Sequence, residues 1–184
     1  MNIPTEFTTL APIGEIYWCR SLFEPYLKGS VLDVGFGCCP VVPHAICMDR
    51  AEGHVDRGLI VADFPTHLVG DARHLYWFAD GVLDAVSSSH CLEDFTLEET
   101  VPVLAEWLRV IKPGGYLCLF LPDQKTYVAY CNSRNELPNG SHKIADFNID
   151  YVKGCLAQLP VEIVEAVWPF PGNPYSFAIV ARKL

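Results

Sequence analysis

The chain has 184 residues, of which 51% are hydrophobic and 19% charged, a composition that predicts one globular domain and excludes a disordered chain. Its 13 Lys and Arg against 22 Asp and Glu give a net charge of −9, and an acidic surface repels the phosphates of an extended nucleic acid. No apolar run approaches the roughly 18 residues that a membrane-spanning helix needs. We therefore expect neither an extended nucleic acid nor a membrane as partner.

The N-terminal third predicts one helix and two strands. Apolar residues at roughly helical spacing predict a helix within residues 15–27. The short apolar runs Ser30–Val34 and Ala45–Met48 predict two buried strands. Only residues 35–44 separate these strands, and a crossover with a complete helix needs about a dozen residues. We therefore expect the first crossover helix to be shortened.

The clearest helix lies between two further predicted strands, Val82–Ser87 and Tyr116–Leu121. Thr96 and Glu99 have the spacing of a capping box, which marks the start of a helix. Residues at steps of 4, 3, 4 and 3 then form one apolar stripe, and Pro113–Gly115 ends it; the stripe consists of Leu97, Val101, Leu104, Leu108 and Ile111.

The C-terminal third predicts two helices and a strand pair. Residues 122–142 predict a short helix and a loop, and Lys143–Leu159 a second helix. Val161–Trp168 and Ser176–Lys183 flank a proline-rich turn and predict two strands. Strands that alternate with helices indicate an α/β fold with a mostly parallel twisted sheet. The final strand pair adds an antiparallel strand at the C-terminal end.

Small and acidic residues follow the predicted strands, where parallel sheets bind their ligands. Gly35 and Gly37 allow a tight turn and a close approach of bare backbone to a ligand. Asp49 stands 16 positions after Asp33, and a carboxylate there can accept both hydroxyls of a ribose. Asp71 can accept from an exocyclic amine such as that of adenine. Each feature alone also fits an ordinary turn, but their order and spacing together predict a nucleoside site.

Cysteines and histidines give no metal-binding pattern. The eight cysteines are spread along the chain without a CxxC pair, which predicts reduced thiols, no structural zinc and a cytoplasmic protein. The adjacent pair Cys38-Cys39 leaves a redox role as a lesser alternative. The six histidines form no HxH or HExxH pattern, so we expect no catalytic metal.

Five segments resemble the motifs of class I S-adenosylmethionine-dependent methyltransferases, in particular small bacterial members. They span about half of the chain and are Val31–Gly37, Met48–Asp49, Gly70–Ala72, Leu83–Asp94 and Leu108–Gly115. The resemblance implies a Rossmann-like three-layer sandwich with S-adenosylmethionine as cofactor. It also implies that the donor contacts Asp33, Gly35, Gly37, Asp49, Asp71, Ala72, Ser88 and Ser89.

The chain departs from the family pattern at Pro40, which replaces the third glycine of GxGxxG. This departure and the shortened helix bear on the choice of cofactor. A dinucleotide needs a helix N-terminus for its pyrophosphate, whereas S-adenosylmethionine carries no phosphate. An acidic chain also suits a cationic sulfonium. Both arguments favour the methyl donor over a dinucleotide.

Methyl transfer is an in-line displacement with a neutral thioether as leaving group, so alignment of the reactants supplies most of the rate. A general base is needed only where the acceptor loses a proton. His90, after the fourth strand, is the candidate base, and Asp123, after the fifth, is a second catalytic candidate. The alternatives are packing beneath the loop for His90 and a turn for Asp123. Arg20 can pair with the donor carboxylate or simply be solvated.

We therefore expect a single methyltransferase domain over residues 1–184. Residues 1–29 would form an N-terminal helical cap, residues 30–122 the donor-binding half, and residues 123–184 the acceptor-side half with the terminal strand pair. The predicted activity is methyl transfer to a small-molecule or sugar acceptor by a monomer or homodimer. A catalytically idle domain that binds the donor or its product is the first alternative. A nucleotide-dependent oxidoreductase is the second.

Overall fold

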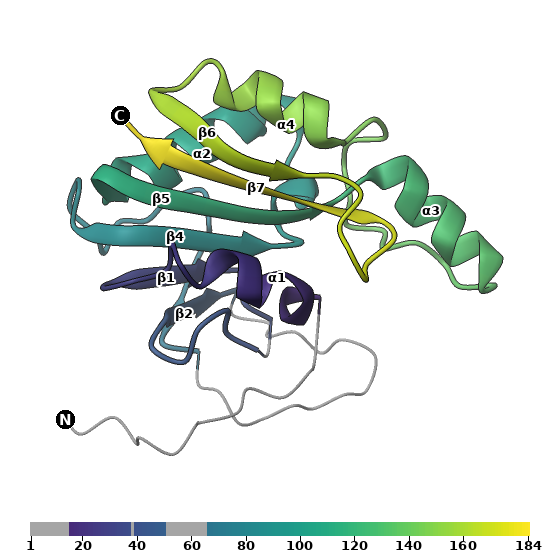
Figure 1. Cartoon of the computed structure of the whole chain (residues 1–184), viewed down its shortest axis with the longest axis horizontal. Helices are drawn as coiled ribbons and strands as arrows, with labels where there is room; N and C mark the ends of the chain where they lie inside the picture. The colour runs from purple at the N-terminus through teal and green to yellow at the C-terminus, as the bar shows by residue number, and fades with distance from the viewer. Residues whose placement is uncertain (1–14, 38, 51–65) are drawn as a thin grey trace.

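The structure is a computed structural model that describes residues 15–37, 39–50 and 66–184. Within these residues, one sheet of seven strands has the order β3-β2-β1-β4-β5-β7-β6. Figure 1 shows helix α1 on one side of the sheet, α2 and α4 on the other, and α3 beyond the strand ends. The strands are β1 (Val31–Val34), β2 (Ile46–Asp49), β3 (Leu68–Val69), β4 (Leu83–Ser89), β5 (Ile111–Pro122), β6 (Val161–Val167) and β7 (Ser176–Lys183). The helices are α1 (Ile16–Phe23), the 3-10 helix η1 (Leu92–Asp94), α2 (Leu97–Val110), α3 (Gln124–Ser133) and α4 (Ile149–Leu156).

The sheet confirms the predicted fold class. Strand β1 pairs in parallel with β2 and β4, and β4 pairs in parallel with β5. Strand β7 runs antiparallel to both β5 and β6. The chain therefore folds as a Rossmann-like three-layer sandwich, and its parallel half brings the ends of β1, β2 and β4 to one edge of the sheet.

Helix α2 begins at the predicted capping box. The Thr96 backbone N–H donates to Glu99 Oε2 at 3.0 Å, and the Thr96 side chain caps the helix in return. The helix ends at Val110, earlier than the apolar stripe predicted, because Ile111 is already extended and begins β5. Pro113 disfavours helical backbone at Lys112, the residue before it, and the extended backbone includes Ile111 as well. Ile111 still points into the core, but as part of a strand.

The described residues between β1 and β2 form turns. The Cys39 backbone N–H donates to the Phe36 carbonyl at 3.3 Å, and the Ala45 N–H to the Val42 carbonyl at 3.1 Å. On this face of the sheet, α1 packs its buried residues against the turns and the strands behind them, in one cluster that contains Ile16, Cys19, Phe23, Val41, Val42, Ala85 and Phe120. Helix α1 thus covers sheet surface that a complete crossover helix would otherwise occupy.

The second predicted C-terminal helix is shorter than its sequence pattern. Helix α4 starts at Ile149 because Asn148 caps it, with Asn148 Oδ1 accepting from the Tyr151 N–H at 2.9 Å. The predicted short helix after β5 is α3. Among the described residues, no helix has the length and apolar character needed to cross a membrane.

Candidate functional site

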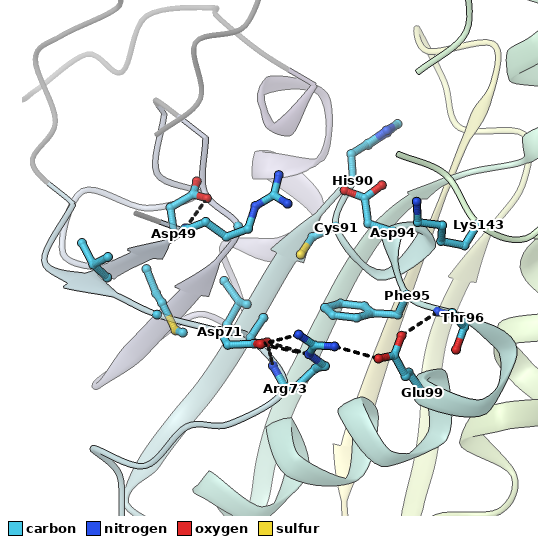
Figure 2. Close-up of a pocket in the computed structure, with 17 residues that line it drawn as sticks. Asp49, Asp71, Arg73, His90, Cys91, Asp94, Phe95, Thr96, Glu99 and Lys143 are labelled. Atoms are coloured by element: carbon cyan, nitrogen blue, oxygen red, sulfur yellow. Dashed lines mark hydrogen bonds and ion pairs between the residues drawn. The ribbon is translucent and has the colours of Figure 1, made fainter. Parts of the chain in front are cut away.

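A cavity of about 500 Å³ lies at the carboxyl ends of β1, β2, β3 and β4. Figure 2 shows its side chains converging from the strand ends and from the start of α2. Its volume lies within the range of small-molecule sites. Its lining includes Gly35, Asp49, Asp71, Ala72, Arg73, His90, Cys91 and Glu99.

Gly35 brings bare backbone to the wall of this cavity. Its φ of +67° favours glycine, and a Cβ there would stand 2.9 Å from both Cβ and Sγ of Cys91. Gly37, with a φ of +63°, lies outside the lining and donates its N–H to Asp49 Oδ2 at 3.0 Å. The tight turn predicted after β1 is therefore present, with the second glycine tied to the end of β2.

Asp49 ends β2 and lines the cavity with 7% of its surface exposed. Its Oδ1 accepts from the Arg50 N–H at 2.7 Å, and its Oδ2 from Gly37. Each carboxylate oxygen can accept more than one hydrogen bond. Asp49 can therefore hold the loop and still accept from ribose hydroxyls.

Asp71 and Ala72 also line the cavity, but Asp71 has a partner that we did not predict. Arg73 Nε lies 2.9 Å from Asp71 Oδ1, and Arg73 Nη2 lies 2.6 Å from Asp71 Oδ2. Arg73 Nη1 also donates to Glu99 Oε1 at 2.8 Å, as Figure 2 shows. The hydrogen bonds from Arg73 lower the pKa of Asp71. An arginine two residues after the predicted acid was the signal that we missed.

Two further predicted donor contacts are buried outside the cavity lining. Asp33 has no exposed surface, and its Oδ2 accepts from the Val41 N–H at 2.7 Å. Burial raises the pKa of Asp33 to about 7. Ser88 is also fully buried and donates to the Val34 carbonyl at 3.0 Å. In the structure, Asp33 shapes the loop between β1 and β2, and Ser88 links β4 to β1.

Ser89 and Arg20 likewise lie outside the lining. Ser89 is half-buried at the end of β4. Arg20, on α1, donates through Nη2 to the Pro40 carbonyl at 3.0 Å and lies 2.7 Å from Cys39 Sγ. Arg20 therefore contacts the loop after β1 and is not simply solvated, whereas its pairing with the donor carboxylate stays a prediction. The cysteine-pair alternative includes Cys38, which lies outside the described residues.

His90 follows β4 and lines the cavity with a side chain that is 10% exposed. Its φ of +50° is uncommon for a residue other than glycine. Nε2 lies 2.9 Å from Ser176 Oγ, and Nδ1 lies 3.2 Å from Glu15 Oε2. Burial lowers the pKa of His90, and the charge of Glu15 opposes this effect. In Figure 2 the His90 ring points away from Asp71 and Arg73.

Asp123 caps α3 and does not line the cavity. Its Oδ1 accepts from the Thr126 N–H at 3.0 Å and from Thr126 Oγ1 at 2.8 Å. These contacts correspond to the turn alternative for Asp123. Among the described residues, His, Cys, Asp and Glu form no group of three or more that can hold a metal ion.

The geometry thus defines an α/β domain with a nucleoside-sized cavity at the strand ends. Residues 32–119 match a family model described as a methyltransferase domain. This match spans just under half of the chain, and together with the fold it supports a class I S-adenosylmethionine-dependent methyltransferase with S-adenosylmethionine as cofactor. The chain matches none of the curated proteins with which it was compared.

Solved structures of S-adenosylmethionine-dependent methyltransferases share this fold. The protein from Archaeoglobus fulgidus is 18% identical, with a TM-score of 0.62 over 92% of this chain and 95% of its own. The protein from Methanosarcina mazei is 19% identical, with a TM-score of 0.62 over 89% and 97%. The protein from Mesorhizobium loti is 12% identical, with a TM-score of 0.63 over 91% and 97%. At these identities, the likeness concerns the fold.

The residues of the cavity fit S-adenosylmethionine. At Gly35 a Cβ would collide with Cys91, so the backbone stays open to a ligand. Asp49 and Asp71 place carboxylates at the ends of β2 and β3, and such groups accept from ribose hydroxyls and amines. The described residues after β1 form turns and begin no helix. S-adenosylmethionine carries no phosphate, so it needs no helix N-terminus there.

Proposed function

We propose that the chain binds S-adenosylmethionine in this cavity and transfers its methyl group to a small-molecule or sugar acceptor. The observation that carries the proposal is the convergence of Gly35, Asp49, Asp71 and Ala72 on one cavity. Asp49 would accept from the ribose hydroxyls, and Asp71 with Ala72 would border the adenine. When bound, the cofactor supplies a methyl group on a cationic sulfur.

The residues of the chain would bind and align the reactants, and alignment is the largest rate contribution that the reaction needs. His90 remains the proposed base, because it is one of the residues that line the cavity and burial lowers its pKa, which keeps a lone pair on the ring. Its ring would have to turn toward the donor, since it points away from Asp71 and Arg73 (Figure 2). Gly37, Asp33, Ser88 and Ser89 would support the site from outside its lining. Asp123 would reach the acceptor only after giving up its contacts with Thr126.

A catalytically idle donor-binding domain is the second candidate. It is favoured by the contacts of the two catalytic candidates: both ring nitrogens of His90 face protein groups, and Asp123 caps a helix. In this candidate the cavity would bind S-adenosylmethionine or S-adenosylhomocysteine without turnover.

Titration calorimetry with S-adenosylmethionine, S-adenosylhomocysteine and NAD tests the cofactor. We expect both sulfur nucleosides to bind and NAD to give no heat; binding of NAD alone would overturn the proposal. A screen of small molecules and sugars with methyl-labelled donor then separates the two candidates. Label in a product supports the enzyme, and silence with intact donor binding supports the idle domain.

Cytoplasmic location, the division into residues 1–29, 30–122 and 123–184, and a monomeric or homodimeric state stay predictions. Light scattering of the purified chain measures the last of these. A mass near 20.5 kDa indicates the monomer, and twice that value indicates the homodimer.

A further inference from the structure

Two carboxyl groups from distant parts of the chain face the same nitrogen of His90. Glu15, at the start of α1, places Oε2 3.2 Å from His90 Nδ1. Glu93, on η1, places Oε1 3.5 Å from the same nitrogen. The side chain of Glu15 is 37% exposed, whereas that of Glu93 is fully buried. The two carboxyl groups thus lie at similar distances from His90 Nδ1, but only the Glu15 side chain is exposed to solvent.

We infer that His90 works with two carboxyl groups in opposite charge states: Glu15 is a carboxylate that stabilises the imidazolium, and Glu93 is a neutral acid that does not. The inference rests on the proposed function, because it assigns Glu15 as a positioning residue for the base of that reaction. Neither glutamate was predicted from the sequence.

A hydrogen bond orients Glu15 at the protein surface. Water reaches its exposed side chain, and the Tyr175 hydroxyl donates to its Oε1 at 2.8 Å. A carboxylate accepts only, so His90 Nδ1 must carry the proton that points at it. The lone pair of His90 then lies on Nε2, where the Ser176 hydroxyl donates at 2.9 Å.

Glu93 lacks what a buried carboxylate needs. Neither of its oxygens has a hydrogen-bond partner, and both are buried. Two imidazoles face its Oε1 beyond hydrogen-bond distance, with His90 Nδ1 at 3.5 Å and His142 Nε2 at 3.6 Å. His142 is itself buried, and its Nδ1 lies 2.6 Å from Gln124 Oε1. Burial raises the pKa of Glu93 well above its usual value and lowers the pKa of His142 to about 4.

The two charge states give His90 a defined role in methyl transfer. The acceptor atom forms a bond to the methyl carbon, and the carbon–sulfur bond breaks with its electron pair on sulfur. The acceptor proton passes to His90 Nε2 once the Ser176 side chain has turned away from that lone pair. Glu15 then faces a positive ring. The titratable groups around His90 in the described residues are Glu15, Glu93, His142 and Tyr175.

The test is an NMR titration of histidine Cε1–H signals in the full-length protein, with His90 assigned by its loss in His90→Gln. We expect Glu15→Gln to lower the His90 midpoint by roughly half to one pH unit, because an opposite charge at this distance favours the charged ring. Glu93→Gln mimics the neutral acid and should leave the midpoint within about 0.2 unit. Glu24→Gln, an exposed glutamate just after α1, is the matched control and should leave the midpoint unchanged.

A midpoint that responds to Glu93→Gln more than to Glu15→Gln would overturn the inference, as would equal responses to Glu15→Gln and Glu24→Gln. Should Glu93→Gln fail to fold, the wild-type protein still decides. At neutral pH, the 13C chemical shift of the Glu93 carboxyl carbon should be that of a protonated carboxylic acid. A shift typical of an ionised carboxylate would contradict the inference. Calorimetry with S-adenosylmethionine on the same samples tests the proposed function separately, because donor binding and the His90 midpoint are independent measurements.

Discussion

The two halves of the molecule hold their site residues by different kinds of contact. In the predicted donor-binding half, two acids bind nearby backbone: Asp33 accepts from Val41, and Asp49 from Gly37. A side-chain pair in this half joins Arg73 to Glu99, which lie 26 positions apart. On the acceptor side, side chains meet side chains across the chain: Tyr175 donates to Glu15, 160 positions away. Contacts between residues that are close in the sequence can be predicted from local motifs. Contacts such as that of Tyr175 with Glu15 form only when the complete chain has folded.

The largest expected effect tests the glycine turn of the donor half. We expect Gly35→Val to abolish binding of S-adenosylmethionine in calorimetry, because a side chain there meets Cys91 and the φ of +67° disfavours valine. Gly114→Val is the matched control. Its φ is also positive, at +79°, but a Cβ there meets nothing within 4 Å. Unchanged affinity in Gly35→Val would refute the placement of the turn at the donor.

The buried acid of the donor half should govern stability against pH. The pKa of Asp33 rises from 3.8 to about 7 on folding. Between these values the unfolded chain loses the proton and the folded chain keeps it, so this group's contribution is complete below pH 3.8 and is lost as the pH rises through 7. Between pH 4 and pH 8, the free energy of unfolding should fall by up to about 4 kcal/mol less in Asp33→Asn than in the wild type. Urea unfolding at pH 4 and pH 8 measures the difference, with exposed Asp150→Asn as control; parallel declines in wild type and Asp33→Asn contradict the prediction.

Asp49 tests the proposed ribose contact. Asp49→Asn keeps the size of the side chain but removes the charge and one acceptor, and hydrogen bonds to charged groups contribute about 1.5–3 kcal/mol. We expect the Kd for S-adenosylmethionine to rise roughly 10- to 100-fold. Asp80→Asn, at a side chain that is 81% exposed, should change the Kd little. Equal affinities of the two variants would place the ribose elsewhere.

The smallest expected effect concerns the contact between the predicted N-terminal cap and the predicted donor-binding half. Arg20 lies on α1 but contacts Pro40 and Cys39 in the loop after β1. Arg20→Lys loses the planar group that reaches both partners, and we expect a roughly 3- to 10-fold weaker donor affinity from about 1 kcal/mol. Lys28→Arg, at an exposed position, is the control. A donor affinity unaffected by Arg20→Lys would show that the loop holds its shape without α1.

Sequence reasoning recovered the fold because its signals are local. The capping box at Thr96, the short apolar strands and the glycine turn each lie within a few residues. It misplaced the end of α2, because Pro113 acts through the backbone of the preceding residues. The family match over residues 32–119 likewise falls on the half where local motifs dominate.

Sequence reasoning predicted only those residues of the candidate site that lie at the ends of strands. Asp49 and Asp71 reached the cavity as expected, whereas Asp33 and Ser88 turned inward to bind backbone. Asp33 and Ser88 lie one residue before the ends of β1 and β4, whereas Asp49 ends β2 and Asp71 follows β3. Sequence patterns do not fix a strand end to a single residue, so they could not separate the two outcomes. The partners of His90 were missed for a different reason: Glu15 and Ser176 lie 75 and 86 positions from it, and only the folded sheet brings them together.

The position of α1 has a consequence for dissecting the protein. Among the described residues, those that line the cavity all lie at or beyond Val34, so a fragment starting at residue 30 would keep this part of the binding surface. The same fragment would lose the helix that shields one face of the sheet, and apolar side chains such as Val31, Ala85 and Phe120 would meet water. A fragment cut at the motif boundaries should therefore be less stable than the full chain, because α1 packs against this face of the sheet.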